Sequence, residues 1–271
     1  MLRPSPNPNH GRYMIATLID IARRAGKKAH AHFGKLTAGD VDRKSSVDMV
    51  TRIDREVEEF LRAELGRAFP DVAFYGEEGS YGNLADLDRV FVVDPLDGTT
   101  SYIHGHPFYS VSVGLREGGR TTAGVVYLPY FDQVYWAERG KGAFHDGKAI
   151  HVSPTDRLID SLAATGFACV RARLEHTNLP LFAEVMPRIR GIRRCGSAAI
   201  DLCYVAQGIY DLYWEFQLQP WDFEAGVLIV EEAGGRVTDL AGGPGYAARR
   251  HLLASNARVH DEFLAIARGH I

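Results

Sequence analysis

The spacing of hydrophobic residues predicts two long amphipathic helices near the start of the chain. Over Met14–Phe33, apolar residues recur at helical spacing with basic residues between them. A second segment of this kind covers about Arg52–Phe69, and Pro70 closes it. The stretch Lys44–Thr51 between them is too polar for a core element, so we expect a loop or a short hairpin there.

A period of two follows over Val72–Val152 and predicts β-strands. Short runs rich in Val, Phe and Tyr alternate with glycine and polar turns, which is typical of a largely antiparallel sheet. The predicted strands are Ala73–Tyr75, Val90–Val93, Tyr109–Leu115, Gly124–Leu128 and Gln133–Glu138.

After about Leu158 the pattern switches between strands and helices, which predicts an α/β half. The predicted strands are Leu162–Phe167, Ile192–Arg194, Tyr210–Trp214, Arg236–Thr238 and His251–Ala254. The predicted helices are Leu174–Arg188, Ala198–Gln207, Phe223–Ala233 and Arg258–Arg268, with a glycine-rich surface loop at Ala241–Gly245.

No linker is long enough to separate independent domains in this chain of 271 residues. We therefore expect one compact unit with its active site between two halves. A flexible proline-rich tail would cover 1–12, an N-terminal α+β half 13–155, and a C-terminal α/β half 156–271.

Composition narrows the class of protein. Hydrophobic residues make up 46% and charged residues 24%, an ordinary balance for a soluble globular protein. The formal net charge of −3 does not favour binding to nucleic acid or to an anionic membrane surface. No stretch approaches the roughly 20 apolar residues that span a bilayer. The three cysteines show no paired spacing, so we expect buried thiols and a cytoplasmic location.

The segment Val92–Thr100 carries the strongest chemical signal. A hydrophobic strand runs into two carboxylates, Asp94 and Asp97, with only two residues between them. Gly98 permits close backbone approach, so both carboxylates are expected on one side beyond the strand. The backbone N–H groups of Gly98 and Thr99, at the start of a helical turn, are suited to hold a phosphate.

Two further acidic positions could complete a site for hard cations. Glu77 follows a predicted strand, and Asp222 begins a predicted helix. Oxygen ligands without matching histidine or thiolate spacing favour Mg²⁺ over zinc. Asp94 and Asp97 could alternatively be turn formers only, but this interpretation weakens once Glu77, Thr99 and Asp222 are considered together.

These motifs, in this order and spacing, resemble the inositol monophosphatase family within the larger lithium-sensitive phosphatase superfamily. The resemblance covers about Ile15 to Ala267. The segments that carry it are Gly76-Glu-Glu78, Asp94-Pro-Leu-Asp-Gly-Thr99, Trp221-Asp222 and Glu231–Gly235.

The resemblance implies a site for two or three Mg²⁺ ions. Glu77, Asp94 and the backbone carbonyl of Leu96 would hold the first ion. Asp94, Asp97 and Asp222 would hold the second, and Glu77 would support a third through waters.

The resemblance also implies catalytic and substrate-binding roles. Thr99 and Asp54, with Glu77, would orient and help deprotonate the attacking water. Glu215 would bind hydroxyl groups of the substrate, although a glutamate at a strand end is also common on protein surfaces. The implied contacts to phosphate and substrate are Asp97, Gly98, Thr99, Ser197, Ala198 and Glu215.

The roles of three basic residues stay open. Lys44 corresponds to a lysine near the entrance of the family's site, but it could equally be a solvated loop lysine. The pair Arg193 and Arg194 is expected to be exposed or paired, and a contact to a second phosphate is the minority interpretation.

The family's fold is a layered αβαβα sandwich, an α/β arrangement that we expect here. Its reaction is Mg²⁺-dependent hydrolysis of a small phosphate monoester by a metal-activated water. The leading substrate is myo-inositol monophosphate, and histidinol phosphate is a close alternative. Fructose 1,6-bisphosphate and nucleotide substrates are weaker ones. A homodimer and inhibition by lithium are also implied.

A non-enzymatic role is the rival from another class. Some members of the family are accessory proteins of transcription, so RNA or polymerase binding is an alternative function. The intact acidic set and the lack of a basic stripe make nucleic-acid binding the weaker prediction.

Overall fold

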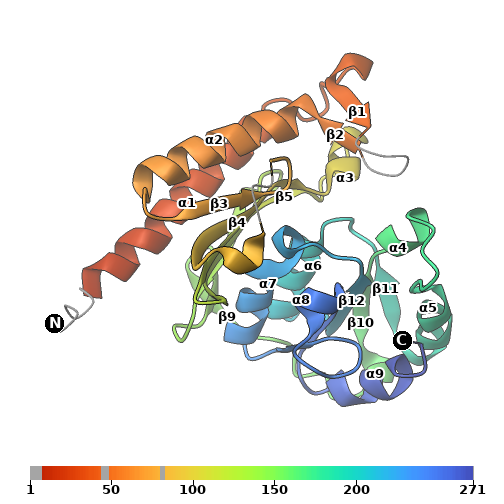
Figure 1. Ribbon diagram of the computed structural model, residues 1–271. Coiled ribbons are helices and arrows are strands. Elements are labelled where there is room, and N and C mark those ends of the chain that lie inside the picture. The colour runs from red at the N-terminus through yellow and green to blue at the C-terminus, as the bar shows by residue number, and fades with distance from the viewer. Residues whose placement is uncertain (1–7, 44–48, 80–82, 271) are drawn as a thin grey trace.

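The computed structural model describes residues 8–43, 49–79 and 83–270, and it arranges them in alternating layers of helix and sheet (Figure 1). Helices α1 (Pro8–His30) and α2 (Arg52–Ala68) lie side by side over the outer face of a larger sheet. Helices α6 (Ala198–Ala206) and α7 (Pro220–Glu232) fill the space between this sheet and a smaller one. Helices α5 (Leu179–Val185) and α9 (His260–Ala267) cover the smaller sheet's outer face. This order is the predicted αβαβα sandwich.

The larger sheet keeps its strands in chain order. They are β3 (Ala73–Gly76), β4 (Arg89–Asp97), β5 (Ser110–Glu117), β6 (Arg120–Leu128), β7 (Gln133–Glu138), β8 (Ala143–His145) and β9 (Lys148–Ile150). Strands β3 and β4 pair in parallel, and every later neighbour in this order is antiparallel. The prediction of a largely antiparallel sheet is therefore confirmed.

The smaller sheet has mixed pairing in the order β11-β10-β12-β14-β13. Its strands are β10 (Leu162–Thr165), β11 (Gly191–Arg193), β12 (Leu212–Phe216), β13 (Arg236–Thr238) and β14 (His251–Ser255). Strands β11, β10 and β12 run parallel, whereas β14 is antiparallel to both of its neighbours. The short remaining elements are β1 (Val41–Arg43), β2 (Met49–Thr51), α3 (Thr99–Ile103), α4 (Ala168–Arg171) and α8 (Tyr246–Arg249).

Separate apolar cores hold these layers together. Buried side chains of α1 and α2 pack on one face of the larger sheet, and those of α6 and α7 pack between the two sheets. A third core, which includes Trp214 and Phe263, fills the space under α5 and α9. Because α6 and α7 are covered on both sides, they are apolar around most of their circumference.

Several boundaries differ from the sequence prediction, each for a local reason. Helix α1 begins at Pro8, so residues 8–12 are helical where a tail was expected; proline is well tolerated in the first helical turn. The helix predicted over Leu174–Arg188 is replaced by the shorter α5 and a 3₁₀ turn that follows it. Pro180 lies in the first turn of α5, and Pro187 lies in the 3₁₀ turn, where its missing N–H interrupts the helical hydrogen bonds. Strands β8 and β9 were missed because each has only three residues.

The prediction of buried thiols is confirmed, and the prediction of a short hairpin is confirmed in part. Strands β1 and β2 pair antiparallel, as a hairpin here requires, and residues 44–48 of the predicted segment lie outside the described ranges. All three cysteines are buried and free. None of the helices in the described ranges combines the length and the hydropathy needed to cross a membrane.

Candidate active site

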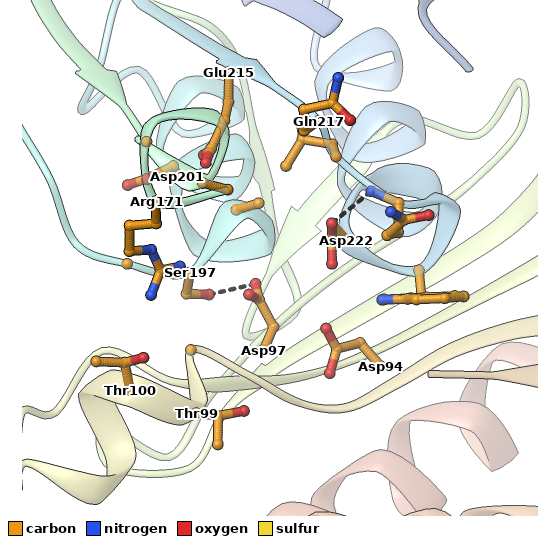
Figure 2. A pocket seen from close by; sticks show the side chains of 18 of the residues that line it. Asp94, Asp97, Thr99, Thr100, Arg171, Ser197, Asp201, Glu215, Gln217 and Asp222 are labelled. Carbon is orange, nitrogen blue, oxygen red and sulfur yellow. Dashed lines mark hydrogen bonds between the residues drawn. The ribbon is translucent and has the colours of Figure 1, made fainter. Parts of the chain in front are cut away.

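A cavity of about 580 Å³ opens where β4, β10 and β12 end and where α3, α6 and α7 begin. This volume suits a small metabolite. Figure 2 shows carboxylates reaching into the cavity from different elements, with Asp94 and Asp97 on one wall and Asp222 facing them from helix α7. Most of the predicted site residues line it, namely Glu77, Asp94, Leu96, Asp97, Gly98, Thr99, Ser197, Ala198, Glu215 and Asp222.

A β-bulge places Asp94 and Asp97 on the same wall. Asp94 pairs with Ser112 and Asp97 with Ser110, so β4 has one residue more than β5 between these pairs. In a regular strand, residues three apart point to opposite faces, and the extra residue cancels this alternation. The strand thus runs through Asp97, whereas the prediction ended it at Val93.

Gly98 makes the turn that follows the bulge. Its φ of 95° is left-handed, and an added Cβ would lie 2.8 Å from the carbonyl oxygen of Phe108. Gly98 caps helix α3, which begins with Thr99 as the predicted helical turn requires.

Glu77 enters the same site from the neighbouring strand. Its backbone N–H donates to the carbonyl of Val93 at 3.2 Å, which continues the parallel pairing of β3 and β4 by one residue. This register brings Glu77 beside Asp94, and the two carboxylates repel each other.

The start of helix α6 fixes Asp97. One carboxylate oxygen of Asp97, Oδ2, accepts a hydrogen bond from the Ser197 hydroxyl at 2.6 Å (Figure 2). The same oxygen accepts a second one from the Ala199 N–H at 2.8 Å. Ser197 is also the N-cap of α6, since its hydroxyl accepts from the N–H of Ile200. Ser197 therefore supports a carboxylate in the described structure.

Asp222 is held by the start of helix α7. Its Oδ2 accepts a hydrogen bond from the Gln219 N–H at 2.6 Å. Asp222 is thus the third residue of α7 and not its N-cap, and its carboxylate forms half of a capping box with Gln219. The carboxylate also lines the cavity, so this role is compatible with one as a cation ligand.

Burial and mutual repulsion make this set of carboxylates costly to ionise together. Burial, followed by repulsion from Glu77, Asp97 and Asp222, raises the pKa of Asp94 well above its usual value. Burial and the charge of Asp97 act in the same direction on the pKa of Asp222. Burial raises the pKa of Asp97 itself to about 6, although the hydrogen bonds from α6 oppose this rise.

Thr99 connects the cavity to helix α2. Its hydroxyl donates to Oδ1 of Asp54 at 2.9 Å and lies 3.1 Å from the carbonyl oxygen of Leu96. Oδ2 of Asp54 accepts from both the N–H and the hydroxyl of Thr51, the reciprocal cap that starts α2. Asp54 does not line the cavity, and its hydrogen bond with Thr99 connects it to the site.

Glu215 occupies the far end of the cavity. Its carboxylate accepts a hydrogen bond from the Tyr213 hydroxyl at 2.7 Å and another from the backbone of Ala168. A Cβ on Gly166 would lie only 2.0 Å from this carboxylate, so glycine at 166 makes room for it. Burial raises the pKa of Glu215, while the Tyr213 hydrogen bond acts in the opposite direction.

The donor set fits hard cations in chemistry and placement. Four carboxylates and the Leu96 segment line one cavity, and bound cations would relieve the repulsion among the acids. Within the described part of the chain, however, no three His, Cys, Asp or Glu side chains stand close enough to hold one ion as they are oriented. The described donors therefore match hard cations in chemical type and in location, but they do not form a complete coordination shell.

Some of the cavity was not anticipated. Asp201, Arg171 and Arg194 all line it, and of these three the sequence analysis considered Arg194, as a contact to a second phosphate. The one available signal for Asp201 was an acid inside the apolar run of α6. Lys44 lies outside the described residues, and Arg193 does not line the cavity.

Comparisons with known proteins agree on one family. The model of the "Inositol monophosphatase family" matches residues 11–271. A protein named Nus factor SuhB from Pseudomonas aeruginosa is 36% identical over 95% of this chain and 97% of its own length. An inositol-1-monophosphatase from Mesorhizobium japonicum is 37% identical over 93% of this chain and 94% of its own.

A solved structure shows the same fold. The extragenic suppressor protein suhB from Bartonella henselae superposes with a TM-score of 0.89 at 37% identity. The match covers 96% of this chain and 100% of that one.

Proposed function

The chain belongs to the inositol monophosphatase family, and from this premise we propose that it is a Mg²⁺-dependent phosphatase of small phosphate monoesters. The observation that carries the proposal is the meeting of Glu77, Asp94, Asp97, Asp222 and Thr99 in one cavity. Members of this family are phosphatases, and the cavity of about 580 Å³ accommodates a small phosphorylated metabolite.

The four acids and the Leu96 carbonyl would hold two or three Mg²⁺ ions. Bound there, these ions would supply positive charge that neutralises the phosphoryl group and makes a nearby water more acidic. Gly98 and Thr99, at the start of α3, line the same space, and their backbone N–H groups would hold the phosphate there. Asp94 and Asp97 serve in this proposal as ligands, so no covalent intermediate is expected.

Thr99 would position the attacking water and receive its proton. Because the Thr99 hydroxyl donates toward Asp54, its oxygen lone pair remains available as an acceptor. A water that donates to this oxygen can pass its proton to Thr99 while the Thr99 proton moves to Asp54. Burial raises the pKa of Asp54, which makes this carboxylate a better proton acceptor than an exposed one.

The leading substrate in this proposal is myo-inositol monophosphate. Glu215 supplies a buried carboxylate at the end of the cavity away from Asp94, where it can accept hydrogen bonds from hydroxyl groups (Figure 2). Histidinol phosphate is the close alternative, and fructose 1,6-bisphosphate and nucleotide phosphates are the weaker ones. A homodimer, a cytoplasmic location and inhibition by lithium belong to the same proposal.

A phosphate-release assay with purified protein tests this function. Each of the named esters is offered with Mg²⁺ and, as a control, with a chelator in excess. We expect Mg²⁺-dependent release from at least one ester, with the highest kcat/KM for myo-inositol 1-phosphate. Absence of release from all of them would overturn the proposal.

A second candidate function has support from the comparisons. The Pseudomonas aeruginosa relative is named a Nus factor, which supports the alternative of an accessory role in transcription. Binding to RNA that weakens with rising salt, measured by fluorescence anisotropy, would favour this role if no phosphate ester is hydrolysed.

A further inference from the structure

Glu58 is a buried carboxylate of helix α2 that the proposed chemistry does not use. Only 4% of its surface is exposed, and carboxylates are seldom buried this deeply unless they are paired. Its Oε1 accepts a hydrogen bond from the Arg62 guanidinium at 3.0 Å. Its Oε2 accepts one from the backbone N–H of Glu78 at 2.7 Å. The second bond joins α2 to the residue that directly follows Glu77 in the wall of the cavity.

The N–H of Glu78 needs an acceptor because of its place in the larger sheet. The N–H of Glu77 donates to Val93 of β4, and successive N–H groups of an extended chain point to opposite sides. The N–H of Glu78 therefore points away from β4, beyond the end of β3, which is the edge strand of this sheet in the described structure. The Glu58 carboxylate supplies the acceptor that a further strand would otherwise provide.

The chain around Glu77 passes close to helix α2 on this side. An added Cβ at Gly76 would lie 2.7 Å from the carboxyl carbon of Glu58, so glycine at this position permits the approach. Arg62, one turn farther along α2, donates to the carbonyl of Gly79 at 3.3 Å. The segment on both sides of Glu77 is thus held against α2 by Glu58 and by its partner Arg62.

The same face of α2 reaches a second wall of the cavity. Asp54 and Glu58 are four residues apart in the helix, so their side chains project from one face. Asp54 accepts a hydrogen bond from the hydroxyl of Thr99, which follows the end of β4. Glu58 acts beyond the end of the neighbouring strand β3, and α2 packs on both strands (Figure 1). One helix therefore sets the relative positions of two segments that carry the site.

We propose that Glu58 is a positioning residue that acts through Glu77, by holding the backbone of Gly76–Gly79 where the Glu77 side chain can serve as a cation ligand. This inference rests on the proposed function, because it presupposes the cation site. Rotation about its side-chain bonds lets Glu77 adjust to an ion, but only among a few staggered conformations. The position of the backbone therefore decides which points these conformations reach. Residues that orient metal ligands commonly contribute tenfold to a hundredfold in metal affinity, about the effect we expect of Glu58.

Calorimetric titration with Mg²⁺ in the absence of substrate tests this role. In Glu58→Gln, a neutral amide oxygen is a weaker acceptor for the Glu78 N–H, and the side chain no longer carries a charge to hold Arg62. We expect the dissociation constant for Mg²⁺ to rise roughly tenfold to a hundredfold. In the phosphate-release assay, the Mg²⁺ concentration at half-maximal rate should rise by the same factor, while kcat at saturating Mg²⁺ stays within about threefold of wild type. An unchanged dissociation constant would overturn the proposal.

A variant that keeps the charge separates positioning from long-range attraction. Glu58→Asp retains the carboxylate on a side chain that is one methylene shorter, so it no longer reaches the Glu78 N–H in the same backbone geometry. Mg²⁺ binding weakened to a similar extent as in Glu58→Gln would support positioning. Wild-type affinity in Glu58→Asp would overturn the proposal, in favour of simple attraction between the Glu58 charge and the ions.

The matched control is Glu64→Gln in the same helix. Glu64 is also a glutamate paired with arginines, and its partners among the described residues are Arg24 and Arg67. Loss of these pairs acts on the contact between α1 and α2 and not on the segment around Glu77. Glu64→Gln should therefore leave the dissociation constant for Mg²⁺ unchanged. An increase as large as that in Glu58→Gln would overturn the specific role of Glu58.

A double-mutant cycle tests whether Glu58 acts through Glu77. Glu77→Gln removes a cation ligand, so it should weaken Mg²⁺ binding by itself. If Glu58 works by placing Glu77, the addition of Glu58→Gln to this variant should change the dissociation constant less than about twofold. Losses that add in full would overturn the proposal. Circular dichroism checks that each variant folds, and if Glu58→Gln does not, Glu58→Asp takes its place in the titration and in the cycle.

The failure of this proposal can be told apart from the failure of the proposed function. Wild-type protein that binds Mg²⁺ but releases no phosphate, together with weaker binding in the Glu58 variants, would sustain Glu58 and reject the phosphatase. Phosphate release by the wild type, with equal Mg²⁺ affinity in every Glu58 variant, would sustain the phosphatase and reject the role of Glu58. Wild-type protein that binds no Mg²⁺ would reject both.

Discussion

The hydroxyl of Thr99 donates a hydrogen bond to Oδ1 of Asp54 at 2.9 Å, although the two residues are 45 positions apart in the chain. Asp54 is buried and is fixed by the reciprocal cap with Thr51, so it cannot follow Thr99 if the turn at Gly98 moves. Thr99 is thus aligned from outside the cavity, by the first turn of helix α2.

Removal of this hydroxyl should reduce catalysis with little effect on folding. We expect Thr99→Ala to lower kcat about 100-fold or more, because general acid–base groups typically contribute this much. Thr99→Ser keeps the hydroxyl and should retain most of the rate. Steady-state kinetics with Mg²⁺ and myo-inositol 1-phosphate measure both variants. A Thr99→Ala enzyme within threefold of wild type would remove Thr99 from the catalytic role.

Replacement of Asp97 should separate activity from folding. Asp97→Asn removes a negative charge from the set that would hold the second cation, so we expect most of the activity to be lost. The Ser197 hydroxyl and the Ala199 N–H can still donate to the amide oxygen, which should preserve the local structure. Phosphate release and circular dichroism check the two halves of this prediction. Near-normal turnover would contradict the assignment of Asp97.

The features that the sequence predicts best are those formed by residues adjacent in the chain. The motif from Asp94 to Thr99 is contiguous, so its acids and its turn could be recognised without a structure. The bulge that aligns Asp94 with Asp97 was missed, although Pro95 inside a strand was a usable signal because proline there is confined to edges and bulges.

Relationships between distant segments could not be predicted in the same way. Gly166 and Glu215 meet because β10 and β12 pair in parallel with Thr165 opposite Trp214, and no local pattern encodes that register. Asp201 was missed because α6 is apolar around most of its circumference, so an acid within it shows no periodicity that points to the cavity.

The close approach of Gly166 to Glu215 gives a steric test of the substrate end of the site. An added Cβ at 166 would lie 2.0 Å from the carboxylate, so Gly166→Ala must displace Glu215. We expect KM for myo-inositol 1-phosphate to rise about tenfold through the lost hydroxyl contact. Cyclohexyl phosphate, which has no hydroxyl groups to bind, should show a much smaller change.

A second glycine provides the control for that experiment. Gly66 lies in α2, and an added Cβ there would meet nothing within 4 Å. Gly66→Ala should leave both KM values unchanged and stabilise the protein by roughly 0.5 kcal/mol, since alanine favours the helix. If Gly166→Ala leaves KM for the inositol ester unchanged, Glu215 does not bind the substrate.

The acidic cavity should make the metal-free protein less stable as pH rises. A carboxyl group whose pKa in the fold lies above its ordinary value stabilises the fold fully below the ordinary pKa. That stability is lost as pH rises through the higher value. For Asp97 this interval runs from 3.8 to about 6. It corresponds to about 3 kcal/mol. The pKa values of Asp94 and Asp222 are raised too and act in the same direction.

A buried histidine, His260, changes the stability of the fold with pH in the opposite direction. Its contribution has to be separated from that of Asp97. Burial lowers the pKa of His260 to about 4, so its contribution is present above 6.5 and is lost as pH falls through about 4. A comparison of wild type with Asp97→Asn cancels this contribution, because both proteins contain His260. With a chelator present, Asp97→Asn should gain in melting temperature relative to wild type as pH rises from 4 to 7.

Addition of Mg²⁺ should make the wild-type protein more stable than Asp97→Asn, the reverse of their order in the metal-free state. Ligands that bind only the folded state raise the melting temperature, and protons compete with cations for the same carboxylates. Wild-type protein should therefore gain more from Mg²⁺ at pH 7.5 than at pH 5.0, and Asp97→Asn should gain less than wild type at pH 7.5. Differential scanning fluorimetry at fixed ionic strength measures the gain in melting temperature for both proteins at both pH values. Equal gains at both pH values and in both proteins would mean that Mg²⁺ does not bind at Asp97, whose burial among like charges is what makes the cavity receptive to cations.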